Sequence, residues 1–372
     1  MHVVQVNFTC DADLADPDAL LARYRTLVAW SDAVAAAGAA RMTVVQAFPY
    51  DARVVRNGIE YMFRPAARLH HAVADARPDL VHVNGLIFPA RTWLLRQTLK
   101  RRTAIVVQDH GGDAPGDGRT AVHRAFRRSA LRAADAFLFA AAEQAAGWQR
   151  AGLMPSNRRV YQVMESSATF HPMPRCEARA ASGVDGEPAI LWVGRLNANK
   201  DPLAVLGGFE LSLAQLPSAK LTMVYQTDDL LAAVRERVEA SRALRGRVRL
   251  VGRVAHDMLE SFYNAADIFV AGSHREGSGY ALLEACACGL VPVVTDIPTF
   301  RVITDGGRFG SLWPVDNPTA FADALVAAAR SDRAHARARI TGHFERALSW
   351  PAIGREAMAA YQDALTERRA RL

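Results

Sequence analysis

Lysine is scarce in this chain of 372 residues, although the chain as a whole is basic. Lys100, Lys200 and Lys220 are the only lysines among 45 basic residues, so each is a candidate for a specific task. The net charge is +7, and most of it lies early in the chain, where residues 1–170 hold 21 basic and 15 acidic side chains. Residues 171–372 are almost neutral, with 24 basic and 23 acidic side chains.

Long hydrophobic runs and a cysteine framework are also absent. No apolar stretch reaches the 18 or so residues that a membrane-spanning helix needs. The first ten residues, MHVVQVNFTC, show no basic region or cleavage site, so we expect no secretory signal and a cytoplasmic protein. The four cysteines suggest no disulfide pattern, and Cys286 and Cys288 would face different sides of a predicted helix, which disfavours a shared metal.

Short apolar strands alternate with helix-length segments along most of the chain. The pattern predicts strands at residues 2–8, 43–48, 80–85, 104–110, 136–141 and 160–165, and again at 189–196, 220–226, 248–254, 268–273 and 291–296. Such β/α repetition is typical of parallel sheets with helices on both faces. We therefore predict an α/β fold of two doubly wound, Rossmann-like domains with a cleft between them.

The domain limits follow from composition. The segment 171–188, HPMPRCEARAASGVDGEP, is rich in proline, glycine and charge without periodicity, and it is the predicted linker. It separates an N-terminal domain, 1–170, from a C-terminal domain, 189–350. A last helix-like segment, 351–372, has no strand of its own to cover.

The segment 273–298, SHREGSGYALLEACACGLVPVVTDIP, departs from an ordinary crossover between two strands. Glu276 lies in the loop, Gly277, Ser278, Gly279 and Tyr280 follow it, and a second acid, Glu284, lies in the first turns of the predicted helix. Glycines at a strand-to-helix turn let a ligand approach the backbone, where free N–H groups attract anions.

Two other strand ends carry polar side chains. VGRLNANKD (193–201) ends a strand with Arg195 and Lys200, and VVQDHGG (106–112) ends a strand with His110 beside two glycines. Each segment alone is typical of a solvated loop. Because ligands bind at the carboxyl ends of parallel strands, the three segments together predict a diphosphate site with an acid-lined pocket.

In this order, Arg195, Lys200 and the E-x7-E spacing of Glu276 and Glu284 resemble the retaining glycosyltransferases of family 4, which have the GT-B fold. CGLVPVVTD (288–296), DLVHVNG (79–85) and YNAADIFVAGS (263–273) fit the same pattern. The resemblance covers nearly the whole chain and is strongest over 189–350. It implies transfer of a sugar from a nucleotide-diphosphate sugar to an acceptor hydroxyl, and a C-terminal helix that packs back toward the N-terminal domain.

The resemblance also implies roles for the site residues. Arg195 and Lys200 would neutralise the departing diphosphate, and the amides of Ser278, Gly279 and Tyr280 would add partial positive charge. No metal and no other cofactor is then expected.

The two acids and the histidine take the remaining implied roles. Glu276 would contact the donor sugar and Glu284 the ribose hydroxyls. His110 matches the histidine of the N-terminal domain that lies near the sugar, and it would bond to the sugar and shape the cleft.

The first loop departs from the family pattern. Residues 8–27 replace the usual glycine-rich loop, and the acids Asp11 and Asp13 in them suggest helix capping rather than Mn²⁺ binding. His82, which alternates within a predicted strand, is interpreted as a core histidine.

Two other classes of protein stay open. A nucleotide-sugar epimerase of the same fold would act on the donor alone, and a non-catalytic nucleotide-sugar-binding protein would need no competent sugar pocket. A dinucleotide oxidoreductase is disfavoured because no G-x-G-x-x-G follows a predicted strand.

The acceptor is open as well, and the expected product is a polysaccharide, a glycolipid or a small glycoside. Basic side chains recur in two helix-like segments of the N-terminal half, namely Arg96, Lys100, Arg101 and Arg102 in 91–102 and Arg124, Arg127, Arg128 and Arg132 in 123–137. Solvated helix faces are the favoured explanation. The alternative is peripheral contact with the anionic inner face of a membrane and a lipid-linked acceptor. We expect no nucleic-acid partner.

Overall fold

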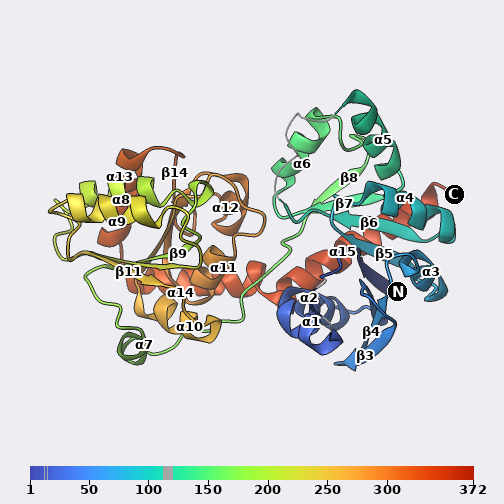
Figure 1. Ribbon diagram of the computed structural model, residues 1–372, viewed down its shortest axis with the longest axis horizontal. Coiled ribbons are helices and arrows are strands. Elements are labelled where there is room, and N and C mark those ends of the chain that lie inside the picture. The colour runs from blue at the N-terminus through green and yellow to red at the C-terminus, as the bar shows by residue number, and fades with distance from the viewer. Residues whose placement is uncertain (12, 15, 112–119) are drawn as a thin grey trace. The chain divides into compact units, whose positions relative to one another are not determined.

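The computed structural model describes residues 1–11, 13–14, 16–111 and 120–372. The chain forms two compact units (Figure 1). Unit 1 comprises Met1–Ser166 and Trp350–Leu372, and unit 2 comprises Ser167–Ser349. Each unit contains one largely parallel sheet with helices packed on it, which is the predicted α/β class.

The sheet of unit 1 has eight strands in the order β3-β4-β2-β1-β5-β6-β7-β8. They are β1 (His2–Asn7), β2 (Arg41–Ala47), β3 (Ala52–Arg56), β4 (Ile59–Arg64), β5 (Leu80–Asn84), β6 (Ala104–Gln108), β7 (Ala136–Phe139) and β8 (Arg159–Gln162). The central strands are buried along nearly their whole length, because helices cover both faces. This explains why they are continuous apolar runs in the sequence.

The edge hairpin of β3 and β4 was not predicted, and its two strands pair antiparallel. Asn57 and Gly58 form its turn, with φ of 53° and 76°. Left-handed backbone at both positions is the geometry of a type I′ turn, for which Asn-Gly is a preferred sequence. The hairpin therefore adds an antiparallel edge to an otherwise parallel sheet.

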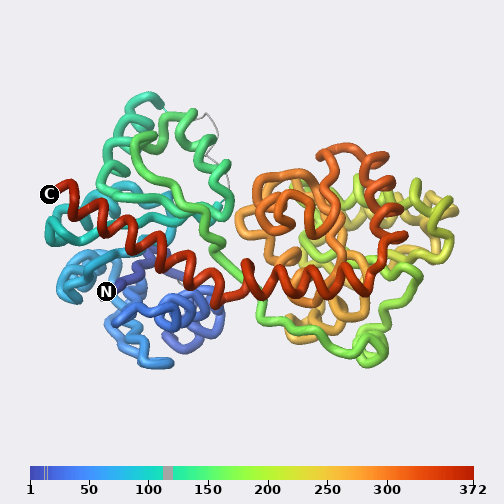
Figure 2. The backbone as a smooth tube through the Cα atoms, turned by 180° about the vertical axis from the view of Figure 1, so that it is seen from behind, coloured from blue at the N-terminus to red at the C-terminus, as the bar shows by residue number. Residues whose placement is uncertain are grey.

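The helices of unit 1 are α1 (Pro17–Arg23), α2 (Arg25–Ala36), α3 (Leu69–Asp75), α4 (Pro89–Thr98), α5 (Ala121–Leu131), α6 (Ala142–Arg150) and α15 (Trp350–Ala370). The last helix runs along the sheet of unit 1 and packs on α2 (Figure 2). Gly354 permits the close approach, since a Cβ there would lie 2.3 Å from the Ala33 carbonyl oxygen.

A buried polar contact also joins α15 to the sheet of unit 1. The Tyr361 hydroxyl and His82 Nδ1 share a short hydrogen bond, and both side chains are fully buried. Burial lowers the pKa of His82 to about 3, so its imidazole stays neutral at physiological pH. The prediction that His82 is a core histidine is confirmed.

The sheet of unit 2 has six strands, all parallel, in the order β11-β10-β9-β12-β13-β14. They are β9 (Ala189–Gly194), β10 (Lys220–Tyr225), β11 (Val248–Gly252), β12 (Ile268–Ala271), β13 (Val291–Thr295) and β14 (Ser311–Trp313). The helical segments are α7 (Arg175–Ser182), η1 (Ala198–Lys200), α8 (Pro202–Ser212), α9 (Leu231–Ala240), α10 (His256–Ala265), α11 (Tyr280–Ala287), α12 (Pro298–Ile303), α13 (Pro318–Arg330), α14 (Arg333–His343) and η2 (Phe344–Leu348).

The predicted linker, 171–188, is instead part of unit 2 and contains helix α7. This helix packs on α10, and Arg175 lies 2.5 Å from a carboxylate oxygen of the buried Asp267. Ion pairs of Arg175 and Arg179 with Asp267 stabilise this helix of eight residues, and so short a helix is easily taken for a linker from composition alone. The boundary between units 1 and 2 lies at residues 166–167, whereas the predicted N-terminal domain ended at 170.

No helix in the described part of the chain combines the length and the apolar character needed to cross a membrane.

Replacing Tyr361 by Phe should lower the free energy of unfolding by about 1–3 kcal/mol, because His82 Nδ1 would lose its partner in a buried setting. Tyr24→Phe is the matched control, since the exposed Tyr24 hydroxyl donates to Asp11 at 2.8 Å. That change should cost about 0.5 kcal/mol or less. Urea unfolding of the two variants measures the difference, and equal losses would contradict a role for the buried contact.

Candidate donor site

The loop between β12 and α11 carries the first acid of the predicted site. Glu276 is largely buried, and its carboxylate accepts a hydrogen bond from Ser273 Oγ at 2.7 Å. The same carboxylate forms an ion pair with Lys200, which ends the short helix η1 after β9. The parallel sheet thus brings two of the predicted residues, 76 positions apart in the sequence, into direct contact.

The pairing of Lys200 and Glu276 places a cation and a hydroxyl-binding acid side by side. A small cavity adjoins the pair and is lined in part by Trp192, Lys200, Ser273, Glu276, Gly279 and Phe300. A glycosyl phosphate offers matching groups, because its phosphate is attached to a carbon beside hydroxyl-bearing carbons. The pair can therefore bind both parts of such a ligand at their junction.

The start of α11 is shaped by Gly279, its N-cap residue. Gly279 has a left-handed backbone, with φ of 66°, and carries no side chain that could cap the amides of the first turn. Thr299 Oγ1 holds the preceding loop by donating to the Glu276 carbonyl at 2.8 Å and to the Gly277 carbonyl at 3.2 Å. The segment of Gly277, Ser278, Gly279 and Tyr280 thus leads directly into a helix N-terminus, as predicted.

The second acid, Glu284, lies on α11 and has partners from α10. Tyr263 donates its hydroxyl to Glu284 at 2.8 Å, and His256 Nε2 lies 3.1 Å from the other carboxylate oxygen. Tyr263 is completely buried, and burial followed by the Glu284 charge raises its pKa well above the usual value, so it remains a donor. Sequence reasoning missed both partners, although His256 directly follows the segment after β11.

Arg195 directly follows β9 and has an exposed side chain. Within the described residues no acid pairs with its guanidinium, in contrast to Lys200. Its charge is therefore available to an anionic ligand on unit 2.

His110 lies at the carboxyl end of β6 in unit 1, and its side chain is 41% exposed. Nδ1 pairs with the buried carboxylate of Glu165, and Nε2 lies 3.4 Å from Asn84 Oδ1. Glu165 was not among the predicted residues, because it belongs to no motif and only its place after β8 could have indicated it. Gly112 of the predicted segment 106–112 lies outside the described residues.

The acids of the first loop, residues 8–27, make hydrogen bonds to nearby residues. Asp16, rather than Asp11 or Asp13, caps a helix by accepting from the Ala19 amide at 2.8 Å. Asp11 accepts instead from the Asp13 amide and from Tyr24. The capping interpretation was therefore placed on the wrong acids, because the helix begins only at Pro17.

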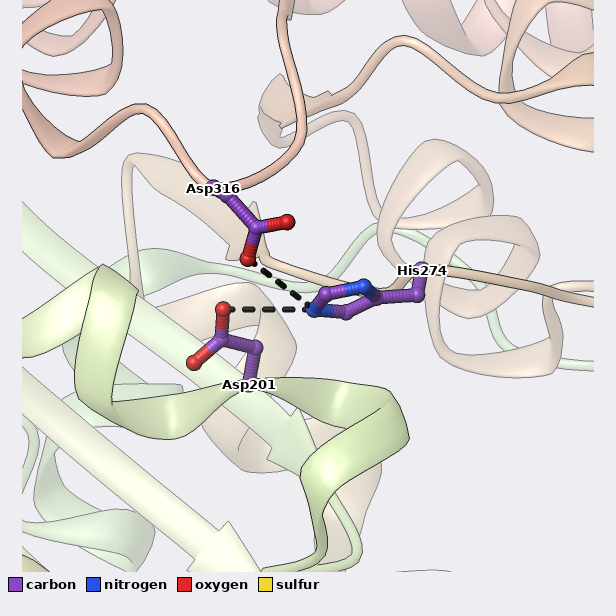
Figure 3. A group of neighbouring side chains, drawn as sticks. All are labelled: Asp201, His274 and Asp316. Carbon is purple, nitrogen blue, oxygen red and sulfur yellow. Dashed lines mark hydrogen bonds and ion pairs between the residues drawn. The ribbon is translucent and has the colours of Figure 1, made fainter.

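One group of three side chains in the described parts of the chain could hold a metal ion (Figure 3). His274 Nε2 lies 3.3 Å from an Asp201 oxygen and 3.6 Å from an Asp316 oxygen. Asp201 also caps α8 by accepting from the Ala204 amide, and the Asp316 side chain is mostly exposed. These contacts form an ion-pair network when His274 is protonated.

Two family models match the chain, one in each unit. The model of the family described as Glycosyltransferase Family 4 matches residues 19–161, and that of Glycosyl transferases group 1 matches residues 187–331. Each match lies wholly within one of the two units.

Two curated relatives illustrate the sequence similarity. The GDP-mannose:cellobiosyl-diphosphopolyprenol alpha-mannosyltransferase of Xanthomonas campestris is 32% identical over 41% of this chain and 40% of that protein. The phosphatidyl-myo-inositol mannosyltransferase of Mycobacterium tuberculosis is 29% identical over 49% of this chain and 50% of that protein. The chain thus spans about half the length of the curated relatives it matches, or less.

Solved structures resemble the chain over nearly its whole length. A sucrose-phosphate synthase from Thermosynechococcus elongatus has a TM-score of 0.67 at 18% identity, with 98% of this chain and 99% of that chain covered. An E. coli trehalose-6-phosphate protein bound with UDP-2-fluoro glucose has a TM-score of 0.69 at 13% identity, with 98% and 99% covered. At these identities the likeness shows the fold alone, which is GT-B.

Replacing Gly279 by Ala should destabilise the start of α11. The new Cβ would lie 3.0 Å from Ile303 Cδ1, in a backbone conformation that costs an L-residue about 1–2 kcal/mol. Gly306→Ala is the matched control, because Gly306 has the same φ of 66° but nothing within 4 Å of its Cβ position. Thermal unfolding should show a larger loss for Gly279→Ala, and equal losses would mean that close packing at Gly279 is unimportant.

Proposed function

We propose that this chain, which belongs to the family 4 glycosyltransferases, transfers a sugar from a nucleotide-diphosphate sugar to an acceptor hydroxyl and retains the anomeric configuration. The observation that carries the proposal is the contact between Lys200 and Glu276 beside the N-terminus of α11. A cation, a carboxylate and helix amides meet there, where a sugar diphosphate presents phosphate next to hydroxyl groups.

Charge stabilisation follows from these positions. As the bond between the sugar and the phosphate stretches, negative charge accumulates on the leaving diphosphate. Lys200 and Arg195 would offset this charge, and the N-terminus of α11 would add about half a positive unit. The acceptor oxygen forms the new bond to the sugar, and its proton passes to a phosphate oxygen.

The two acids would bind different parts of the donor, one of which changes during the reaction while the other does not. Glu276 would bind hydroxyls of the sugar, whose ring changes shape and charge during transfer. Glu284, oriented by Tyr263 and His256, would bind the ribose, which stays the same throughout. His110 would bond to the donor sugar from unit 1.

We further propose that no metal is required, since the positive charge comes from side chains and helix amides. Activity should then persist in EDTA. The Asp201, His274 and Asp316 group offers a control, because His274→Ala should leave activity unchanged if the group holds no functional ion.

The function is tested by incubating the protein with GDP-mannose and with UDP-glucose, first alone and then with candidate acceptors. Donor alone should stay intact, whereas an epimerase would convert it. A lipid-linked saccharide and phosphatidylinositol are the first acceptors to try, since the names of the relatives contain them. Release of nucleoside diphosphate together with an α-linked product supports the proposal, and binding without turnover under all conditions contradicts it.

Replacing Lys200 by Ala should lower kcat by roughly 10²–10³-fold, as expected for loss of one group that stabilises developing charge. Arg195→Ala should act in the same direction. Lys200→Arg should restore only part of the rate, because a planar guanidinium presents its donors differently from an ammonium. Lys220→Ala is the matched control, since Lys220 also pairs with an acid in unit 2, the exposed Asp185. Near-normal turnover by Lys200→Ala would refute the assignment.

Substitutions of the two acids should distinguish an effect on nucleotide binding from an effect on turnover. Glu284→Gln should weaken nucleoside diphosphate binding and raise KM with little effect on kcat, because its contact would be the same in the ground and transition states. Glu276→Gln should mainly lower kcat. Calorimetry with the diphosphate and steady-state kinetics measure the two effects, with the exposed Glu239→Gln as control. Equal losses of affinity in both acid variants would mean that their roles do not differ.

The acceptor side of the proposal concerns helices α4 and α5, which pack on each other. Two of their arginines make contacts inside the fold and do not belong to the exposed basic surface. Arg96 pairs with the buried Asp135 at 2.8 Å, and Arg127 is buried with its guanidinium 4.8 Å from the Trp148 ring centre. Counting basic residues at helical spacing could not distinguish these two from solvated ones.

The remaining surface of α5 combines apolar and basic groups. Val122 and Phe126 lie one turn apart and are 79% and 55% exposed. Arg128 and Arg132 are exposed on the same segment. Exposed apolar side chains next to arginines are typical of helices that lie on an anionic membrane, so we propose that α5 contacts such a surface and that the acceptor is lipid-linked.

Replacing Val122 and Phe126 by Ser, or Arg128 and Arg132 by Ser, should each reduce co-sedimentation with vesicles containing phosphatidylglycerol. Each basic residue adds on the order of 1 kcal/mol of attraction to anionic lipid, which salt screens. Val55→Ser is the matched control, since Val55 is 62% exposed on β3. Equal binding to neutral phosphatidylcholine vesicles, or none at low salt, would favour a water-soluble acceptor.

A further inference from the structure

A buried carboxylate behind His110 has no place in the roles described so far. Glu165 follows β8 at the carboxyl edge of the unit 1 sheet, and its side chain is only 5% exposed. Burying a carboxylate is costly unless a charged or donating partner compensates it. The ion pair with His110 Nδ1 provides such a partner.

The contacts on both ring nitrogens indicate the protonation state of His110. Nδ1 faces the carboxylate of Glu165, which accepts hydrogen bonds. Nε2 faces Asn84 Oδ1, because the amide nitrogen of Asn84 is directed toward Asn7 Oδ1 as a donor. A neutral imidazole carries one N–H and could donate to only one of these oxygens. Two acceptors therefore favour the imidazolium, which donates through both nitrogens.

The surrounding charges also favour the protonated form of His110. Burial alone would lower the pKa of His110, but the carboxylates of Glu165 and Asp109 outweigh it and raise that pKa above its usual value. His82 on β5 interacts electrostatically with His110 but stays neutral, because burial lowers the pKa of His82 to about 3.

We propose that Glu165 is a positioning residue that holds His110 as an imidazolium, so that Nε2–H acts as a charged donor toward a substrate oxygen. His110 then serves as a hydrogen-bond donor and not as a base. Its partly exposed ring can reach a ligand, whereas Glu165 beneath it cannot. This inference rests on the proposed sugar transfer, in which His110 bonds to the donor sugar.

The test compares the wild type with Glu165→Gln, Glu165→Asp and Asp75→Asn by NMR titration of the His110 ring. Gln keeps an oxygen that can accept from Nδ1 but removes the charge, so the titration midpoint of His110 should move to lower pH. Asp restores the charge and should return the midpoint toward that of the wild type. Asp75 is exposed on α3 and has no contact with His110, so Asp75→Asn is the matched control.

The activity readout is the pH profile of transfer. At pH values below both midpoints, Glu165→Gln should approach the wild-type rate, because the ring is protonated in both proteins. Between the two midpoints it should fall toward the rate of His110→Ala, a loss on the order of 10²-fold for one charged donor. A purely structural role would instead lower the rate by the same factor at every pH.

Three results would overturn the proposal. The first is an unchanged His110 midpoint in a folded Glu165→Gln variant. The second is a shifted midpoint with a rate ratio that does not vary with pH. The third is a rate that rises as His110 loses its proton, which would make His110 a base. If the wild type transfers sugar from no donor, the proposed function fails, while the NMR titration still decides whether Glu165 sets the charge of His110.

Discussion

Parallel strand pairing is the constraint on which both groups of candidate residues depend. In a parallel sheet all strands end at one edge, so residues far apart in the sequence meet there without long side chains. In unit 2 the edge brings Lys200, after β9, to Glu276, after β12. In unit 1 it brings His110, after β6, to Glu165, after β8. A helix or loop in place of a strand would break either contact.

Each edge carries a cation paired with an acid, and the pairing matters for the ligand-free protein. An unpaired ammonium or carboxylate in these partly buried loops would lose hydration without compensation. In the ligand-free protein Lys200 and Glu276 compensate each other. Under the proposed function a diphosphate would replace Glu276 as the partner of Lys200, and sugar hydroxyls would bind Glu276. Donor binding would then exchange one set of charged contacts for another and would leave no buried charge without a partner.

The main elements could be predicted from the sequence because buried parallel strands are continuous apolar runs. The predicted strands all exist, and the spacing of Glu276 and Glu284 indicated the candidate site. The hairpin at Asn57 and Gly58 carried a recognisable turn signal that was missed. Helix α7 lies between Pro174 and the left-handed Gly183, which are weak boundary signals, and part of its stability comes from Asp267, which is distant in the sequence.

Side-chain partners were the least predictable part of the site. Glu165, His256 and Tyr263 became visible only when the fold placed them beside predicted residues. Arg96 was misjudged for the same reason, because its helical spacing suggests a solvated face while Asp135 holds it inside. Sequence patterns show which side chains share a face, but not what covers that face.

The packing of α15 in unit 1 has a consequence for the order in which the protein can form. During synthesis the strands of unit 1 leave the ribosome before unit 2, but the helix that covers α2 and supplies Tyr361 leaves only after all of unit 2. Until then the nascent chain exposes the apolar face around Ala33 and leaves His82 without its hydroxyl partner. Unit 2, whose chain is continuous, can complete its fold before unit 1 does. The contacts of α15 in unit 1 can therefore form only after all of unit 2 has been translated.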